Sequence, residues 1–169
     1  MAGDLLIRTV EQADLPALLE LYRDLNPSDP PLALADATLV WRQISNYTGC
    51  TIFVGVLDKA LITSCTLVIV PNLTRGGLPY ALIENVVTSA KHRKQGHGAA
   101  VLKHAFAEAW KHGCYKIMLL TGSKTPATLK FYKDVGFEQN KTGFQIRRLP
   151  VRASDVRGPR RIRMIPPAA

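Results

Sequence analysis

A chain of 169 residues with 47% apolar and 21% charged side chains has the length and composition of one globular domain, which excludes a disordered or multi-domain protein. No apolar run approaches the roughly 20 residues of a membrane span, and acidic residues interrupt the N-terminal stretch where a secretory signal would lie, so we expect a cytoplasmic protein. Twenty-two Lys and Arg against thirteen Asp and Glu give a net charge of +9, which raises the question of an anionic partner.

The N-terminal half predicts a strand, two helices and a β-hairpin. Apolar residues at helical spacing follow Asp14 and Pro16, and the proline-rich stretch 26–31 separates this helix from the next. Two runs rich in β-branched residues flank Asp58 and Lys59, which is typical of a hairpin turn. The expected elements are a strand at residues 5–10, a helix after Asp14, a second helix that ends before Gly49, and strands at residues 51–57 and 61–70.

The C-terminal half predicts a central strand followed by alternating helices and strands. Residues 80–88 form a continuous apolar run, interrupted by Glu84 and Asn85, as in a strand that is covered on both faces. The expected later elements are a helix at residues 95–112, a strand at 115–120, a helix capped by Thr125, and a final strand or hairpin at 137–149. This order predicts a single α/β domain at residues 1–149, in which helices flank a mixed sheet.

The remaining residues, 150–169, form a basic tail rich in proline and arginine. Five arginines oppose one aspartate there, so the tail contributes much of the positive charge. A nucleic-acid partner is one hypothesis for this charge, although the tail lacks the aromatic side chains that stack on single-stranded bases. It predicts binding that weakens steeply with salt and disappears when the tail is deleted. We favour a solvated tail over this hypothesis.

The turn that leads from the central strand into the long helix contains the residues that most clearly indicate a ligand site. Gly96 and Gly98 allow close approach of a ligand to the backbone, and a helix start presents unpaired N–H groups and a positive dipole end. Arg93 and Lys94 add positive charge just ahead of the glycines. The pattern favours a phosphate site, and the alternative is a tight turn beside a solvated basic patch.

Other ligand patterns do not fit this sequence. Val101 stands where a dinucleotide fingerprint needs a third glycine or alanine, and Ser123 and Ile117 break the pattern of a P-loop ending at Lys124. The four histidines lack the carboxylate partners and spacing of a metal centre, and the three cysteines are too widely spaced for a zinc site. We therefore expect no metal cofactor and no disulfide framework.

The motif R-x-x-G-x-G at Arg93, Gly96 and Gly98 resembles the pyrophosphate loop of the GNAT family of N-acetyltransferases. The likeness extends over residues 7–148 and is most specific at 80–137, where it is similar to the glucosamine-6-phosphate N-acetyltransferase branch. Leu120 departs from that branch, whose members carry an acidic residue there. The resemblance implies a mostly antiparallel mixed sheet, acetyl-CoA as the co-substrate and an amine as the acceptor.

The resemblance also implies roles for individual residues. The amides of residues 95–99 would hold the pyrophosphate, while the central strand, where its neighbour splays away, would bind the pantetheine and polarise the acetyl carbonyl. Tyr132 would donate a proton to the departing thiolate, and Glu84 would bind substrate or act as a base through water, the alternative being a structural salt bridge. The residues expected to contact the donor are Val86, Val87, Thr88, Arg93, Lys94, Gln95, Gly96, His97, Gly98, Ala99, Thr128 and Tyr132.

Two alternatives to an enzyme stay open at this point. A regulatory domain that binds acyl-CoA without turnover would keep the glycine loop but need neither Tyr132 nor Glu84, and the nucleic-acid hypothesis rests on the tail. A small amine or an amino sugar is the favoured acceptor, a protein lysine also remains possible, and the resemblance makes a homodimer plausible. The sequence predicts no membrane partner.

Overall fold

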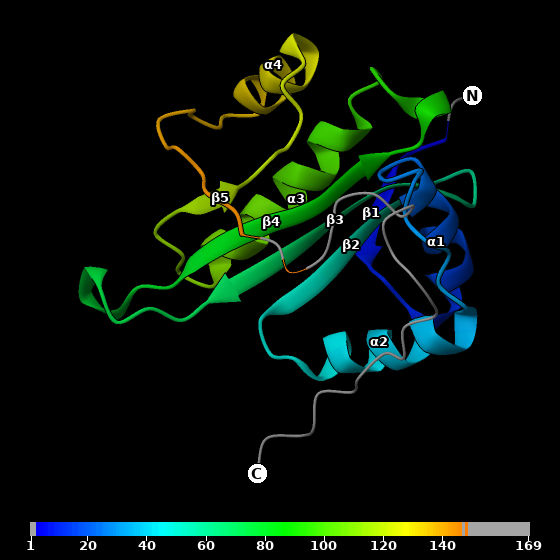
Figure 1. Ribbon diagram of the computed structural model, residues 1–169, viewed down its shortest axis with the longest axis horizontal. Helices are drawn as coiled ribbons and strands as arrows, with labels where there is room; N and C mark the ends of the chain where they lie inside the picture. Colours follow the sequence, from blue (N-terminus) through cyan, green and yellow to red (C-terminus); the bar gives the residue numbers. More distant parts are fainter. Residues whose placement is uncertain (1–2, 147, 149–169) are drawn as a thin grey trace.

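A computed structural model describes residues 3–146 and 148. Five strands form one sheet in the order β1-β2-β3-β4-β5, in which the first four are antiparallel and β5 joins β4 in parallel (Figure 1). The strands are β1 (Leu6–Thr9), β2 (Cys50–Leu57), β3 (Ala60–Val70), β4 (Tyr80–Thr88) and β5 (Ile117–Leu119). The helices are α1 (Leu15–Arg23), α2 (Leu34–Asn46), α3 (His97–Lys111) and α4 (Pro126–Asp134). The mixed, mostly antiparallel sheet flanked by helices confirms the predicted fold class.

Helices cover both faces of this sheet. The face under α3 buries alternate strand residues such as Phe53, Leu67 and Ile83. Small residues in α3, including Ala105 at 0% exposure, allow the helix to lie close to the sheet. The opposite face packs against α1 and α2 through a second cluster, which consists of Val10, Leu18, Ile52 and Val54 with Tyr22, Trp41 and Ile44. The sheet is therefore a rigid platform between two layers.

The hairpin between β2 and β3 turns where the sequence predicts it. Asp58 and Lys59 have φ values of 47° and 67°, and Leu57 pairs with Ala60. Two consecutive left-handed residues match the twist of the flanking strands, which is why Asp is favoured at such positions. The turn fixes the register of the sheet's central strands.

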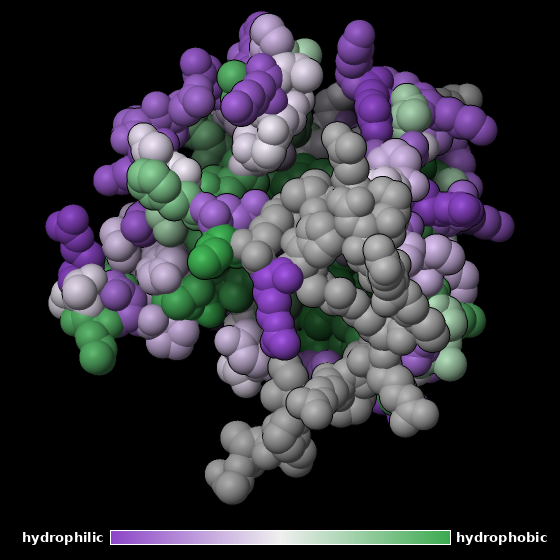
Figure 2. Space-filling view, viewed as in Figure 1, coloured by the Kyte–Doolittle hydropathy of each residue, from purple (hydrophilic) through white to green (hydrophobic). Residues whose placement is uncertain are grey.

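The predicted final strand at residues 137–149 is wrong for the part that the structure describes. Residues 137–146 contain no strand, and the apolar side chains of Phe144 and Ile146 are 91% and 99% exposed. The neighbouring β5 is only three residues long, so it offers few backbone groups for a further strand. Exposed apolar surface gathers over the β4 and β5 side of the molecule (Figure 2). Residues 147, 149 and the tail at 150–169 lie outside the described residues.

The helices in the described residues do not have the dimensions of membrane spans. None of them is both long enough and apolar enough to cross a membrane.

A forked ion pair joins β1 to the start of α1. Arg8 Nη1 and Nη2 donate to Asp14 Oδ2 and Oδ1 at 2.6 and 2.9 Å, and the Glu11 N–H donates to Asp14 Oδ2 at 2.8 Å. The hydrogen bonds from Arg8 lower the pKa of the Asp14 carboxyl, with burial opposing them. The pair therefore stabilises the folded chain most when Asp14 is ionised.

We predict that Asp14→Asn lowers the free energy of unfolding by about 1–2 kcal/mol at pH 7. Because the folded-state pKa is lowered, this contribution is complete above the ordinary value of 3.8 and is lost as the pH falls below it. Urea unfolding at pH 7 and pH 3 measures the change. Asp29→Asn, which alters an exposed carboxylate with no ion pair in the described residues, is the control. An Asp14→Asn deficit that is equally large at pH 3 would contradict this prediction.

Candidate active site

The turn between β4 and α3 adopts the geometry of an anion site. Lys94 and Gly96 have φ values of 61° and 86°, and the first backbone bond of α3 runs from Ala100 N–H to Gly96 C=O at 2.9 Å. The N–H groups of His97, Gly98 and Ala99 therefore have no partner inside the helix. Three adjacent donors at a positive helix end suit a phosphate group.

The two glycines of this turn are required for different reasons. A Cβ at Gly98 would lie 3.0 Å from Thr88 Oγ1 and 3.3 Å from the Phe131 ring, so glycine lets α3 touch both β4 and α4. A Cβ at Gly96 would meet no atom within 4 Å, and that position instead needs glycine for its left-handed backbone. The open space beside Gly96 leaves its backbone accessible.

Arg93 makes contacts that the sequence did not reveal. Its Nε donates to Thr88 C=O at 3.1 Å, and its Nη2 donates to Asp24 C=O at 3.3 Å. The guanidinium thus ties the end of β4 to the end of α1, and its remaining N–H groups can still serve an anion. The predicted phosphate contact of Arg93 stays a prediction.

Of the other polar side chains at this turn, Gln95 is exposed and His97 is half-buried. Gln95 Nε2 donates to Lys91 C=O at 3.3 Å, and His97 Nε2 lies 3.4 Å from Gln95 Oε1. Lys94 is exposed and has no ion pair in the described residues. These three residues, all predicted to contact the donor, therefore lie at or just before the start of α3.

The central strand β4 carries a bulge beside this turn. Its pairing with β3 passes from Thr66–Glu84 to Ser64–Val87, so β4 has an extra residue there, and Asn85 has a φ of 53°. Val86 lies inside the bulge, without a register partner on either neighbouring strand. The bulge changes the direction of the strand at the middle of the sheet.

The parallel pairing of β4 with β5 ends just before the bulge. Its last register pair is Ile83 with Leu119, so the two strands separate beyond that point. The carbonyl groups of Val87 and Thr88 accept hydrogen bonds from Thr63 Oγ1 and Arg93 Nε. Val86, the third predicted backbone contact on this strand, has no register partner in the described pairing, and its binding role stays a prediction.

The charge of Glu84 acts on the Tyr132 phenol near this gap. Burial raises the pKa of the Tyr132 phenol, and the negative charge of Glu84 raises it further. Glu84 itself is exposed, so the strand is not covered on both faces at this residue as its apolar run predicted, and the left-handed Asn85 follows directly. No ion pair involves Glu84 in the described residues, which leaves the structural salt-bridge alternative without a visible partner.

A group of buried hydroxyls beneath Glu84 was not anticipated from the sequence. Thr66 stands directly opposite Glu84 on β3, and the hydroxyl oxygens of Tyr22, Ser64 and Thr66 have no hydrogen-bond partner in the described residues. Burial raises the pKa of Tyr22, while the two neighbouring hydroxyls lower it. Alternation of Ser64 and Thr66 along β3 was the available signal, since it places both on one face.

Thr128 belongs to the cap of α4. Thr125 Oγ1 accepts from the Thr128 N–H at 3.4 Å and donates to Thr128 Oγ1 at 2.9 Å, which confirms the predicted N-cap. Ser123 Oγ also donates to Thr128 Oγ1 at 3.2 Å. The contact of Thr128 with the donor stays a prediction.

The thiols and possible metal ligands lie apart from this gap. Burial raises the pKa of the Cys65 thiol to about 12, so Cys65 is a core residue and an unsuitable nucleophile. In the residues that the structure describes, no three His, Cys, Asp or Glu side chains gather as metal ligands.

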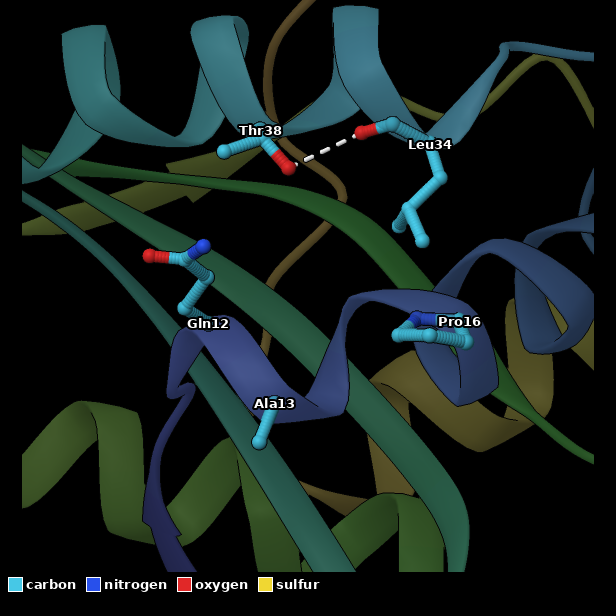
Figure 3. A pocket seen from close by; sticks show the side chains of 5 residues that line it. All are labelled: Gln12, Ala13, Pro16, Leu34 and Thr38. Atoms are coloured by element: carbon cyan, nitrogen blue, oxygen red, sulfur yellow. Dashed lines mark hydrogen bonds between the residues drawn. The ribbon is translucent and has the colours of Figure 1, made fainter.

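An open pocket of about 440 Å³ lies at the other end of α1. Gln12, Ala13 and Pro16 line one side of it and Leu34 and Thr38 of α2 line the other, where Thr38 Oγ1 donates to Leu34 C=O (Figure 3). None of these side chains is a base or a nucleophile at neutral pH. The pocket therefore offers no chemistry that competes with the gap at β4.

Comparison with known proteins agrees with this geometry. Residues 15–137 match the model of the acetyltransferase (GNAT) family. The chain is 32% identical over 141 residues to a glucosamine 6-phosphate N-acetyltransferase of Trypanosoma brucei brucei, covering 82% of this chain and 92% of that protein. A solved putative acetyltransferase of Agrobacterium tumefaciens is 50% identical, with a TM-score of 0.81 over 84% of this chain and 99% of that one.

A more distant structure shares the fold. An aminoglycoside N-acetyltransferase solved in complex with CoA is 17% identical, with a TM-score of 0.73 over 88% of this chain and 98% of that one. The chain belongs to the acetyltransferase (GNAT) family. It is accordingly an N-acetyltransferase that uses acetyl-CoA as its donor.

We predict that Gly96→Ala weakens CoA binding roughly tenfold, measured by isothermal titration calorimetry, because a Cβ would occupy the open side of the turn. Gly113→Ala is the matched control, since Gly113 is also left-handed, with a φ of 73° and no atom within 4 Å of a Cβ, but lies at the far end of α3. Both substitutions cost about 1 kcal/mol of stability. Equal CoA affinities in the two variants would contradict the assignment of the turn.

Proposed function

We propose that the protein transfers the acetyl group of acetyl-CoA to a primary amine by direct attack, with a small amine or an amino sugar as the acceptor. The observation that carries this proposal is the end of the β4–β5 pairing at Ile83 and Leu119, next to the strand that leads to the open N–H groups of α3. The charge of Glu84, the next residue of β4, acts on the Tyr132 phenol. A binding module would need the N–H groups alone. A carboxylate whose charge acts on a protonated phenol favours catalysis instead.

The residues present fit the donor. The N–H groups of His97, Gly98 and Ala99 would bind its diphosphate, and the cationic entrance at Lys94 would attract it. Val86, in the bulge of β4, would direct its backbone at the thioester. A backbone N–H there would stabilise the oxyanion that forms as the carbonyl carbon becomes tetrahedral.

The acceptor must lose a proton before it can attack. With a lysine-like pKa near 10.4, about one amine molecule in a thousand is neutral near pH 7. The exposed carboxylate of Glu84 would accept the proton from the ammonium group, directly or through water. The amine nitrogen then forms a bond to the acetyl carbon, and the carbon–sulfur bond breaks.

Tyr132 would complete the reaction. Its raised pKa keeps the phenol protonated at neutral pH, and the departing thiolate needs a proton. The phenol would donate that proton and recover one from solvent. The ammonium group loses two protons in all. Glu84 would pass the first to solvent, and the second, released from the nitrogen after attack as the amide forms, would offset the proton that Tyr132 gives to the thiolate.

The acceptor proposal draws on the relatives. The 32% identical protein is named a glucosamine 6-phosphate N-acetyltransferase, so this amino sugar is the first acceptor to test. Leu120, which is 68% exposed, replaces the acidic residue of that branch and argues for a different contact at the end of β5. A panel of amines with CoA thiol release as the readout would identify the acceptor.

Location and assembly are further parts of the proposal. We propose a cytoplasmic protein and a homodimer, the latter to be tested by light scattering of the full chain. The regulatory-domain alternative would be favoured by CoA binding without turnover of any amine. Salt-sensitive binding to nucleic acid that is lost without residues 150–169 would support the other alternative.

We predict that Tyr132→Phe lowers kcat by roughly a hundredfold, because the thiolate loses its proton donor. Thiol release under saturating acetyl-CoA measures kcat. Tyr47→Phe removes the hydroxyl of an exposed tyrosine at the C-terminal end of α2 and is expected to have no effect. Unchanged kcat in Tyr132→Phe would remove the acid role.

We predict that Glu84→Gln also lowers kcat, and that the deficit shrinks as the pH rises from 7 toward 10. The sign follows because a base is needed least when the amine is already neutral. A pH series of both enzymes measures the ratio of their kcat values. A kcat deficit that stays constant with pH, or a change in KM with no change in kcat, would assign Glu84 to acceptor binding instead.

A further inference from the structure

Two hydrogen bonds join the end of α1 to the turn that follows β4. Asp24, which caps α1, accepts the Ala90 N–H on Oδ2 at 3.1 Å. Its carbonyl oxygen accepts Arg93 Nη2 at 3.3 Å. These partners lie 66 and 69 positions away in the sequence, so Asp24 is the point where an N-terminal helix holds the entrance to the donor site.

The segment held by Asp24 leads straight into the N–H groups of α3. It leaves β4 at Thr88, makes a short 3-10 turn at Ala90–His92, and reaches Gly96 within four residues of that turn. Arg93 Nε also bonds Thr88 C=O at 3.1 Å, which closes the segment on itself. Fixing Ala90 and Arg93 therefore fixes how the segment enters the helix.

The charge of Asp24 argues for a positional role. A carboxylate close to a site for a diphosphate repels the ligand, so its charge opposes binding. What the carboxylate supplies is an acceptor for a backbone N–H that starts a turn. Glu20, one turn earlier on α1, differs because it pairs with Arg23 on the exposed face of the helix.

The geometry points to Asp24 as a positioning residue for acetyl-donor binding: by holding Ala90 and Arg93, it sets the turn that presents the N–H groups to the diphosphate. This inference rests on the proposed function, because it takes that turn as the donor site. Asp24 touches neither the donor nor the reacting atoms. It acts through the backbone that it holds.

The same contacts link the donor site to the segment between α1 and α2. The Leu25 and Asn26 N–H groups donate to Tyr22 C=O at 3.1 and 3.0 Å, directly after Asp24. CoA that stiffens the turn will therefore slow hydrogen exchange at these two amides through Asp24. If Asp24 only stabilised the fold, CoA binding would not slow hydrogen exchange at Leu25 and Asn26.

The test compares three variants of the full chain, with CoA as the probe. Asp24→Ala removes the acceptor and is expected to raise the Kd for CoA roughly tenfold, while Asp24→Asn keeps an amide oxygen and is expected to bind CoA at least as tightly as the native protein. Glu20→Ala is the control and should leave Kd unchanged. Thermal unfolding reports separately whether each variant is folded.

Ala90→Pro supplies an independent variant if Asp24→Ala fails to fold. Proline removes the N–H donor but leaves the carboxylate, and Ser89 at φ −48° and ψ 135° has a backbone that tolerates a following proline. The variant is expected to raise Kd as Asp24→Ala does, and to lose the CoA-induced slowing of exchange at Leu25 and Asn26.

The outcomes separate this inference from the proposed function. If the native protein does not bind CoA, the donor site itself is wrong. If the native protein binds CoA while folded Asp24→Ala and Ala90→Pro bind it equally well, the donor site stands and the role of Asp24 is overturned. Weaker binding in both Asp24→Ala and Asp24→Asn would show that the charge matters and would also overturn it.

Discussion

The structure depends on the separation of β4 from β5. Parallel pairing ends at Ile83 and Leu119, and the bulge at Asn85 follows within two residues. Backbone polar groups in the middle of a sheet normally find partners, so a gap there is costly unless a ligand fills it. The same bulge exposes Glu84, which would otherwise lie inside an apolar strand. The bulge at Asn85 thus accounts both for the change in direction of β4 and for the exposure of the Glu84 carboxylate.

Helices on both faces of the sheet position residues near this gap. On one side, α3 begins with open N–H groups, and Gly98 lets it lie against Thr88 and Phe131, so the anion site and the helix that carries Tyr132 keep a fixed relation. On the other side, α1 places Asp24 on the entrance to the same turn. The donor would be held by backbone whose position is set from both faces of the sheet.

Much of the fold could be predicted from the sequence, because its signals are local. The run at residues 80–88 predicted β4 with its observed bounds, and Asp58 with Lys59 predicted the hairpin. The strand or hairpin predicted at 137–149 is wrong for residues 137–146, because the sequence of such a run does not report whether a partner edge is long enough.

Only the part of the site that lies in a short sequence motif could be predicted. Gly96 and Gly98 marked the turn, but the exposure of Glu84 depends on a left-handed Asn85 that no pattern signalled. The contacts of Asp24 join residues more than sixty positions apart, and periodicity along the chain cannot report them. Such contacts follow from tertiary packing rather than from local preference.

The measurement that tests the account most directly is a crystal structure of the protein with CoA bound. The account predicts the diphosphate on the N–H groups of His97, Gly98 and Ala99, and the thiol in the gap between β4 and β5, within reach of the Tyr132 hydroxyl. A diphosphate bound at any other surface, or a thiol that points away from the gap, would contradict it.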